Sequence, residues 1–298
     1  MARLIVLLVL LLSILPVQAD RRDIAQLRTQ LESTVQLRGS ITINPDGTVQ
    51  GHELDAQAHS QLSPELETFI DRNVASWRFE PVRVNGQVVR AKVPMHLRLV
   101  ANQDATGNYV VRIASTYFGG DSTEGLATDS PRVKGKMTPP KYPLGALRAG
   151  GEGTVYLILE FGRDGKVLHA GAAQVNLRAL GTDRQMQDLR EVLADASIRA
   201  ALTWTFLPPT TGEEAGADSW KVNVPINFRI TDRRLGPTRR EREQAKTESQ
   251  WETYLPGPIN LLPWAGEEQK TAGNPDALPD SGVFPLKQGA RLLNPPTG

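Results

Sequence analysis

Two separate stretches of this chain carry the same unusual order of residue types. Residues 77–81 and 204–208 both read Trp-x-Phe-x-Pro, and each is followed, after a polar turn, by an alternating run with Val-Pro at its middle. The two runs cover residues 89–99 and 221–230. Self-similarity of this kind indicates an internal duplication, so the fold must be built from two related units.

The residues before each motif predict the same order of elements. In the first half, a hairpin around the turn 44–47 precedes a helix that begins after Ser63. In the second half, a hairpin around 163–166 precedes a helix with a capping box of Thr182 and Gln185. We therefore expect an α+β fold of two tandem units, each a small antiparallel sheet (β-β-α-β) packed on one helix.

The remaining segments differ from these units in composition. Residues 20–36 carry an apolar stripe that predicts a lead-in helix, and 109–113 predict a further strand. The tail is first charged and then rich in proline, which indicates a largely irregular segment. Its apolar patch at 251–264 either docks on a unit or forms a linear interaction motif. The predicted divisions are a signal segment at 1–19, a first unit at 20–101, a linker at 102–137, a second unit at 138–231 and the tail at 232–298.

The first residues have the layout of a secretory signal. Arg3 supplies a short basic region, 4–15 form an apolar run, and small residues end the segment at Ala19. The apolar run is shorter than the roughly 20 residues that a membrane-spanning helix needs. We expect cleavage after Ala19 and export of a soluble protein. The alternative is an uncleaved anchor, the only case in which this chain would contact a membrane.

Composition excludes several functional classes. The chain has no cysteine, which rules out a disulfide framework, a cysteine zinc cluster and a thiol nucleophile. Its formal net charge is +1, with basic and acidic residues interleaved, so nothing favours nucleic-acid binding. The histidines lie in separate elements, and the glycine-rich run at 150–153 lacks the Lys-Ser/Thr of a phosphate loop. We expect no metal, no cofactor and no enzymatic activity, since no catalytic arrangement has a local signature.

The second unit carries a series of short motifs in a fixed order. They are Tyr142-Pro143, Gly151-x-Gly153-Thr154-Val155, Asp164-Gly165-Lys166-Val167, Trp204-x-Phe206-x-Pro208 and Val224-Pro225-Ile226-x-Phe228. This series, which covers about 139–230, resembles the TonB C-terminal domain. The first unit is similar to a diverged copy that keeps the Asp-Gly turn, the Trp-x-Phe-x-Pro motif and the Val-Pro strand but lacks the Tyr-Pro opening.

The resemblance implies a periplasmic protein that binds other proteins. In that family the domain grips the amino-terminal box peptide of outer-membrane transporters by strand addition, in which main-chain hydrogen bonds give affinity. Energy transducers of the family also have an anchor helix with a histidine and a long proline-rich spacer, and 1–36 contain neither feature. Three functions stay open: a periplasmic partner-binding module linked to outer-membrane transport, a TonB-type energy transducer anchored in the inner membrane, and an envelope scaffold that binds other envelope proteins.

The aromatic half of the repeated motif is expected to belong to the core. Trp77 and Phe79 stand two residues apart on one face of an extended segment, and Trp204 with Phe206 do the same. Aromatic side chains of this size dominate the packing of small cores.

The last strand of each unit is the better candidate for partner binding. Its apolar side chains face the core, and Pro94 and Pro225 favour placement at a sheet edge, since proline cannot donate to a ladder. Proline also protects an edge from pairing, so peptide capture and a merely guarded edge both remain open. In the second unit the predicted partner-binding residues are Lys221, Asn223, Pro225, Asn227 and Arg229.

Overall fold

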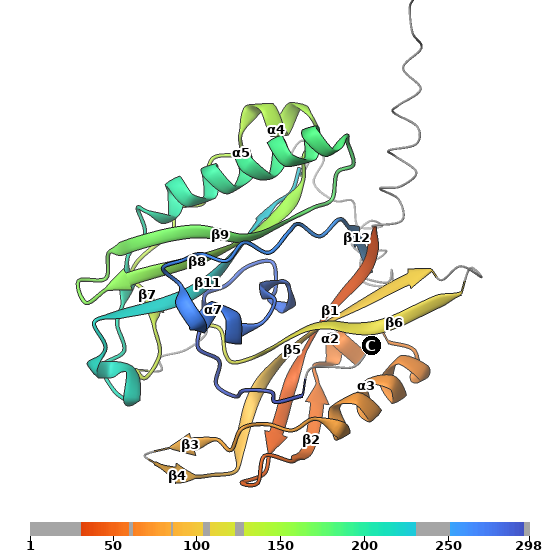
Figure 1. Ribbon diagram of the computed structural model, residues 1–298, viewed down its shortest axis with the longest axis vertical. Helices are drawn as coiled ribbons and strands as arrows, with labels where there is room; N and C mark the ends of the chain where they lie inside the picture. Colours follow the sequence, from red (N-terminus) through yellow and green to blue (C-terminus); the bar gives the residue numbers. More distant parts are fainter. Residues whose placement is uncertain are drawn as a thin grey trace, which may run out of the picture.

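The computed structural model describes residues 31–59, 62–84, 86–103, 108–122, 128–230 and 251–294. These residues form two larger antiparallel sheets, with one long helix on the outer face of each (Figure 1). The C-terminal segment, 251–294, lies between the sheets and is drawn in blue in Figure 1. The described part of the chain is thus α+β, as the sequence predicts.

The N-terminal sheet has the strand order β12-β1-β5-β6, and β2 pairs with the remaining part of β1. Helix α3 covers its outer face (Figure 1). Its strands are β1 (Glu32–Ile43), β2 (Val49–Leu54), β5 (Ala91–Gln103), β6 (Tyr109–Phe118) and β12 (Glu252–Tyr254). The other elements of this half are α2 (Ala56–His59), α3 (Pro64–Ser76), β3 (Arg83–Val84) and β4 (Gln87–Val88). The strand predicted at 109–113 is therefore present, as part of β6.

The C-terminal sheet has the strand order β13-β11-β8-β9. Helix α5 packs on β8 and β9, and its N-terminus has the predicted capping box of Thr182 and Gln185. The elements are α4 (Leu144–Arg148), β8 (Gly153–Gly162), β9 (Val167–Leu177), α5 (Asp183–Ala201), η1 (Glu213–Gly216), β11 (Ser219–Phe228) and β13 (Phe284–Pro285). A short pair, β7 (Arg132–Val133) and β10 (Phe206–Leu207), and α7 (Gly266–Ala272) with η2 (Pro275–Ala277) complete the fold.

Two of the sequence predictions are wrong at the N-terminal sheet. The lead-in helix predicted to reach residue 36 is replaced by β1, because Thr34 and Val35 pair with β5 and favour an extended backbone. The rest of that helix lies outside the described residues. The last strand of the first unit is not an edge either, since β5 pairs with both β1 and β6. Pro94 fits there because its carbonyl faces the end of β6, where Gly119 donates to it, so the ladder with β1 stays intact.

Each half has its own core between the sheet and its helix. Trp77 and Phe79 are buried beneath α3, and both contact Phe118 edge to face. Trp204 and Phe206 are buried beneath α5, with Phe206 stacked on β8. Aromatic rings of this size supply much of the buried area in small cores.

The same local contact joins the hairpin to the aromatic motif in both halves. The amide of Phe79 donates to the carbonyl of Gly47 at 2.9 Å, and that of Phe206 donates to Gly165 at 2.8 Å. Both glycines have positive φ, 81° and 79°. A Cβ on either would lie 2.1 Å from the carbonyl oxygen of the facing phenylalanine, so only glycine fits.

Strand β8 is buried on both faces, which one helix cannot achieve. Val155 and Leu157 face α5, while Tyr156 and Ile158 lie on the opposite face and are also buried. The C-terminal segment covers this second face through Leu278 and Leu286. Of the two alternatives for the tail, the structure therefore has the docked one, with short elements joined by irregular backbone.

The close approach at Gly165 can be tested against a matched glycine. We expect Gly165→Ala to lower the free energy of unfolding by at least about 3 kcal/mol, since it adds a backbone clash to an unfavourable φ. Gly135 has a φ of 73° with open space around it, so Gly135→Ala should lose only about 1 kcal/mol. Urea denaturation measures both, and equal losses would contradict the contact.

Candidate functional site

The outer edge of β11 is the candidate site. On its inner side β11 pairs with β8 along its whole length, and on its outer side it meets β13 only at Val222 and Asn223. The carbonyl of Lys221 accepts a hydrogen bond of 2.9 Å from the amide of Leu286. Because backbone groups alternate in direction along a strand, the N–H and C=O groups of every second residue counted from Lys221 point to this edge. Pro225 is one of those residues, so its missing N–H leaves the ladder with β8 intact.

All five predicted partner-binding residues lie on this edge or at its end, and the chain's own C-terminal segment meets Lys221, Asn223, Asn227 and Arg229. Asn223 and Pro225 are buried, and Asn223 lies opposite Phe284. Lys221 forms an ion pair of 3.0 Å with Glu268. The sequence alone placed these side chains outward, whereas in the structure Asn223 and Pro225 are buried, Lys221 and Asn227 are half-buried and Arg229 is exposed.

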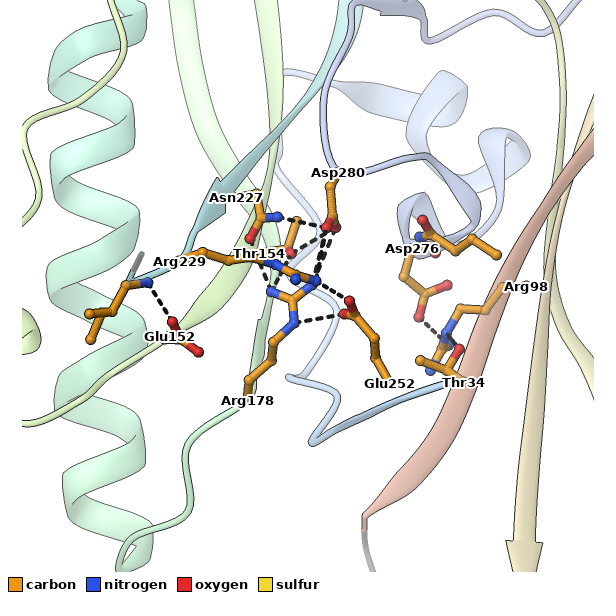
Figure 2. Close-up of polar contacts among 12 residues, drawn as sticks. Thr34, Arg98, Glu152, Thr154, Arg178, Asn227, Arg229, Glu252, Asp276 and Asp280 are labelled. Atoms are coloured by element: carbon orange, nitrogen blue, oxygen red, sulfur yellow. Dashed lines mark hydrogen bonds and ion pairs between the residues drawn. The ribbon is translucent and has the colours of Figure 1, made fainter. Parts of the chain in front are cut away.

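Arg178, at the end of β9, is the centre of a charged cluster at the far end of this edge (Figure 2). Its guanidinium lies 3.0 Å from Glu252 and 3.2 Å from Asp280. Asn227 accepts from Arg178 at 3.0 Å and donates to Asp280 at 2.6 Å. Arg229 pairs with Glu252. Burial opposes the charged form of Glu252, but the bond from Arg229 and the charge of Arg178 outweigh it and lower the pKa of its carboxyl.

A second charged cluster is centred on Arg98 of β5 and is buried. Its guanidinium lies 2.5 Å from Asp276 and 2.6 Å from Glu32. Asp276 also accepts a bond of 2.5 Å from Ser115 and is fully buried. The ring of Tyr254 lies 4.4 Å from the Arg98 guanidinium carbon. This cluster ties the C-terminal segment to the N-terminal sheet with charge-assisted hydrogen bonds, the stronger kind in proteins.

Phe284 of β13 is the centre of an aromatic cluster that also includes residues of β5 and β6. The ring of Phe284 contacts His96 and Tyr117, each at a centroid distance of 5.6 Å. The Tyr117 hydroxyl donates to the carbonyl of Pro285 at 2.9 Å. Burial, with the nearby charge of Arg38, lowers the pKa of His96 to about 4, so this imidazole is neutral at pH 7.

The opposite edge of the C-terminal sheet is covered as well. Leu255 exchanges backbone hydrogen bonds of 2.8 and 3.0 Å with Leu177 of β9. Further along, the amide of Asn260 donates to Ala173 at 2.8 Å, and Gln174 donates to the carbonyl of Gly257. The C-terminal segment therefore lies along both edges of this sheet.

Several of these residues could not be found from sequence patterns. Arg178, Arg98, Asp276 and Asp280 stand alone in the sequence, and they meet only because the tail returns between the sheets. The one available signal was the apolar patch at 251–264. From that patch Tyr254 and Leu255 are buried, whereas other members such as Leu261 remain exposed.

Within the described ranges, no group of His, Cys, Asp and Glu is arranged to bind a metal ion. None of the helices in those same ranges combines the length and the apolar character required to cross a membrane.

Comparison with known proteins gives a partial match to one class. The protein tonB2 of Pseudomonas aeruginosa is 34% identical over 95 residues, which cover 30% of this chain and 28% of the relative. The protein TonB of Xanthomonas campestris pv. campestris is 33% identical over 94 residues, or 32% of this chain and 36% of the relative. The chain spans about a third of the length of these curated relatives. No family model and no solved structure matches. These similarities support a TonB-like domain in the chain.

The Arg98 cluster predicts a large loss of stability when it is broken. Arg98→Met leaves the buried Asp276 without its cation and should lower the free energy of unfolding by about 3–5 kcal/mol. Arg163→Met breaks an exposed pair with Asp218 and should lose no more than about 1 kcal/mol. The double variant Arg98→Met/Asp276→Leu should recover much of the loss. Chemical denaturation compares the three, and a small effect of Arg98→Met would contradict the assignment.

His96 predicts a stability loss in mild acid. Its pKa is about 4 in the folded state and 6.5 when unfolded, so the unfolded state binds more protons between these values. Stability should fall as the pH drops from 6.5 to 4, by up to about 3 kcal/mol from this residue. His96→Gln should remove that part of the pH dependence. Equal slopes for the two proteins, or an NMR titration of His96 near pH 6.5, would contradict it.

Proposed function

We propose that this protein is a non-enzymatic periplasmic module that captures an extended segment of an outer-membrane transporter along the edge of β11. The observation that carries the proposal is that this edge already accepts an extended strand, since β13 pairs with it in antiparallel register. Strand addition requires such an edge. The partner-binding residues are Lys221, Asn223, Pro225, Asn227 and Arg229.

The polar groups around the edge support the same proposal. Arg178 and Asn227 donate toward the end of β11 and favour an acidic group on the bound segment. Buried side chains line the middle of the edge, which favours an apolar stretch there. Pro225 limits the length of the ladder, so side-chain pockets would contribute to affinity beside main-chain bonds.

The TonB-like similarity supplies the cellular context of the proposal. Two relatives carry the name TonB, and the resemblance in the motifs points to TonB-dependent transport. The signal-like segment at 1–19 favours export to the periplasm and lies outside the described residues. If that segment stays uncleaved, the protein would instead be anchored in the inner membrane and could act as an energy transducer. Intact-mass measurement of the exported protein separates the two, because a mature start at Asp20 removes the anchor.

We also propose that the N-terminal half is a diverged copy of the TonB-like domain that does not capture peptides. In the N-terminal half β5 pairs with β1, and in the C-terminal half β11 pairs with β8 in the same way. Both halves also have the hydrogen bond from the phenylalanine of the Trp-x-Phe motif to a turn glycine, Gly47 or Gly165. In the N-terminal half β6 fills the outer side of β5, so the corresponding edge is not available. Binding is therefore assigned to the second unit alone.

The proposal is tested by titrating the full chain with a labelled amino-terminal peptide of an outer-membrane transporter. We expect saturable binding that Asn227→Pro weakens at least tenfold, since proline removes a backbone donor on the outer side of β11. Leu202→Ala, at an exposed position near Trp204, is the matched control and should bind as the wild type does. Fluorescence anisotropy measures all three.

No binding at millimolar peptide, either to the wild type or to forms with a weakened C-terminal contact at β11, would exclude peptide capture. It would favour an envelope scaffold, in which the β11 edge is only guarded. Equal binding by Asn227→Pro and Leu202→Ala would move the site away from the edge.

A further inference from the structure

We infer that residues 280–286, here named the strap, are an internal ligand of the β11 edge and mimic the segment that this edge captures. The partner segment is then an extended peptide with a carboxylate followed, three and four residues later, by two apolar side chains. This inference rests on the proposed capture of a strand at β11. It specifies the chemistry of the bound peptide, and it identifies the strap as a segment of the same chain that competes with that peptide.

The backbone of the strap forms hydrogen bonds on both of its sides, and the space that it occupies is here called the slot. Leu286 donates to Lys221 on β11, and Phe284 lies opposite Asn223. On the other side, the carbonyl of Val283 accepts from the amide of Ser122 at 2.7 Å. The slot therefore lies between β11 and the chain that follows β6.

The side chains of the strap alternate between two apolar pockets. Val283 is fully buried in the core beneath α5. Phe284 is also fully buried, but it packs on the other face with Tyr117 and Tyr156. Leu286 points to the same face as Phe284 and packs with Ile158. An alternation with period two is the way an extended segment is read along a sheet edge.

The carboxylate of Asp280 occupies a site built from three donors. Asn227 donates at 2.6 Å, Thr154 at 3.1 Å and Arg178 at 3.2 Å (Figure 2). All three side chains belong to the C-terminal sheet or its immediate end, so they remain in place without the strap. An ionised carboxylate bound by a guanidinium and neutral donors gains a strong, geometrically specific interaction. The site therefore selects an acidic residue at this position.

The strap can leave without unfolding the rest of the C-terminal segment. On its N-terminal side, Asp276 is bound to Arg98, and on its C-terminal side, Gly289 donates to Phe118 at 2.8 Å. These contacts do not include the strap itself. A tethered ligand has an effective concentration on the order of millimolar, so an external peptide must compete against it. Release of the strap is thus the step that makes the β11 edge available.

The first experiment uses the full chain and a labelled peptide with the sequence of residues 279–287. Asp280→Asn and Phe284→Ala change only the strap and leave the receptor residues of β11 intact. Each should bind the peptide at least tenfold more tightly than the wild type, because the internal competitor is weaker. Glu267→Gln, which makes the same charge change as Asp280→Asn on exposed α7, should bind as the wild type does. No binding of the peptide to either strap variant at millimolar concentration would overturn the inference.

The second experiment locks the strap on β11 with a disulfide. Val222 and Pro285 are directly opposed, at a spacing that suits a disulfide, and the natural chain has no cysteine. Val222→Cys/Pro285→Cys should bind the peptide when reduced and lose at least nine-tenths of that binding when oxidised. The wild type should not respond to the oxidant. Equal binding by the oxidised and reduced forms would overturn the inference, and the reduced form controls for folding.

A parallel titration with the transporter peptide separates this inference from the proposed function. Binding of the 279–287 peptide to Phe284→Ala, without binding of any transporter peptide, keeps the inference and removes the transporter as partner. Equal binding of the transporter peptide to wild type, Phe284→Ala and the oxidised double-cysteine form overturns the strap as competitor and moves transporter binding away from the part of β11 that the strap covers. Tighter binding by Phe284→Ala and loss on oxidation, for both peptides, supports the two together.

Discussion

The hydrogen-bonding groups along the two edges of the C-terminal sheet need partners, and the arrangement of the molecule follows from how they are satisfied. An isolated three-stranded sheet would leave β9 and β11 open on their outer sides. Here 255–260 supply bonds to β9, and 284–286 supply them to β11. Because one segment must reach both edges, it crosses the inner face of the sheet and buries it.

Charge fixes where that segment crosses. Arg98 holds Asp276 in a fully buried position, and Arg178 holds Asp280 at the end of the β11 edge. A buried pair of this kind adds little net stability compared with apolar packing, but breaking one partner is costly, so it specifies one register. From Asp280 onward the strap follows β11, the edge to which the proposed function assigns the partner.

The repeated patterns made much of each half predictable from sequence. The hairpins and the capped helices depend on contacts between residues close in sequence, and local chemistry determines them. The burial of the Trp-x-Phe motifs was predictable from the size of their aromatic side chains. The strand at Thr34 and Val35 was not predictable, because long-range pairing with β5 overrides a helical stripe.

The candidate edge was predictable only in part. Alternation along 221–230 predicted a strand and Pro225 predicted its place at an edge, but the segment that pairs with it lies more than 50 residues away in a proline-rich tail that carries no periodic signal. Single charged residues such as Arg178 and Asp280 have no pattern that links them.

The most direct test of the account is amide hydrogen exchange in the full chain with and without the 279–287 peptide. The strap should open independently, so saturating peptide should increase exchange at the amide of Leu286, which donates to Lys221. The amide of Leu278, beside the Asp276 anchor, should keep its protection. If bound peptide leaves the protection of Leu286 unchanged, or if Leu278 and Leu286 lose protection together, the strap does not exchange places with a partner strand.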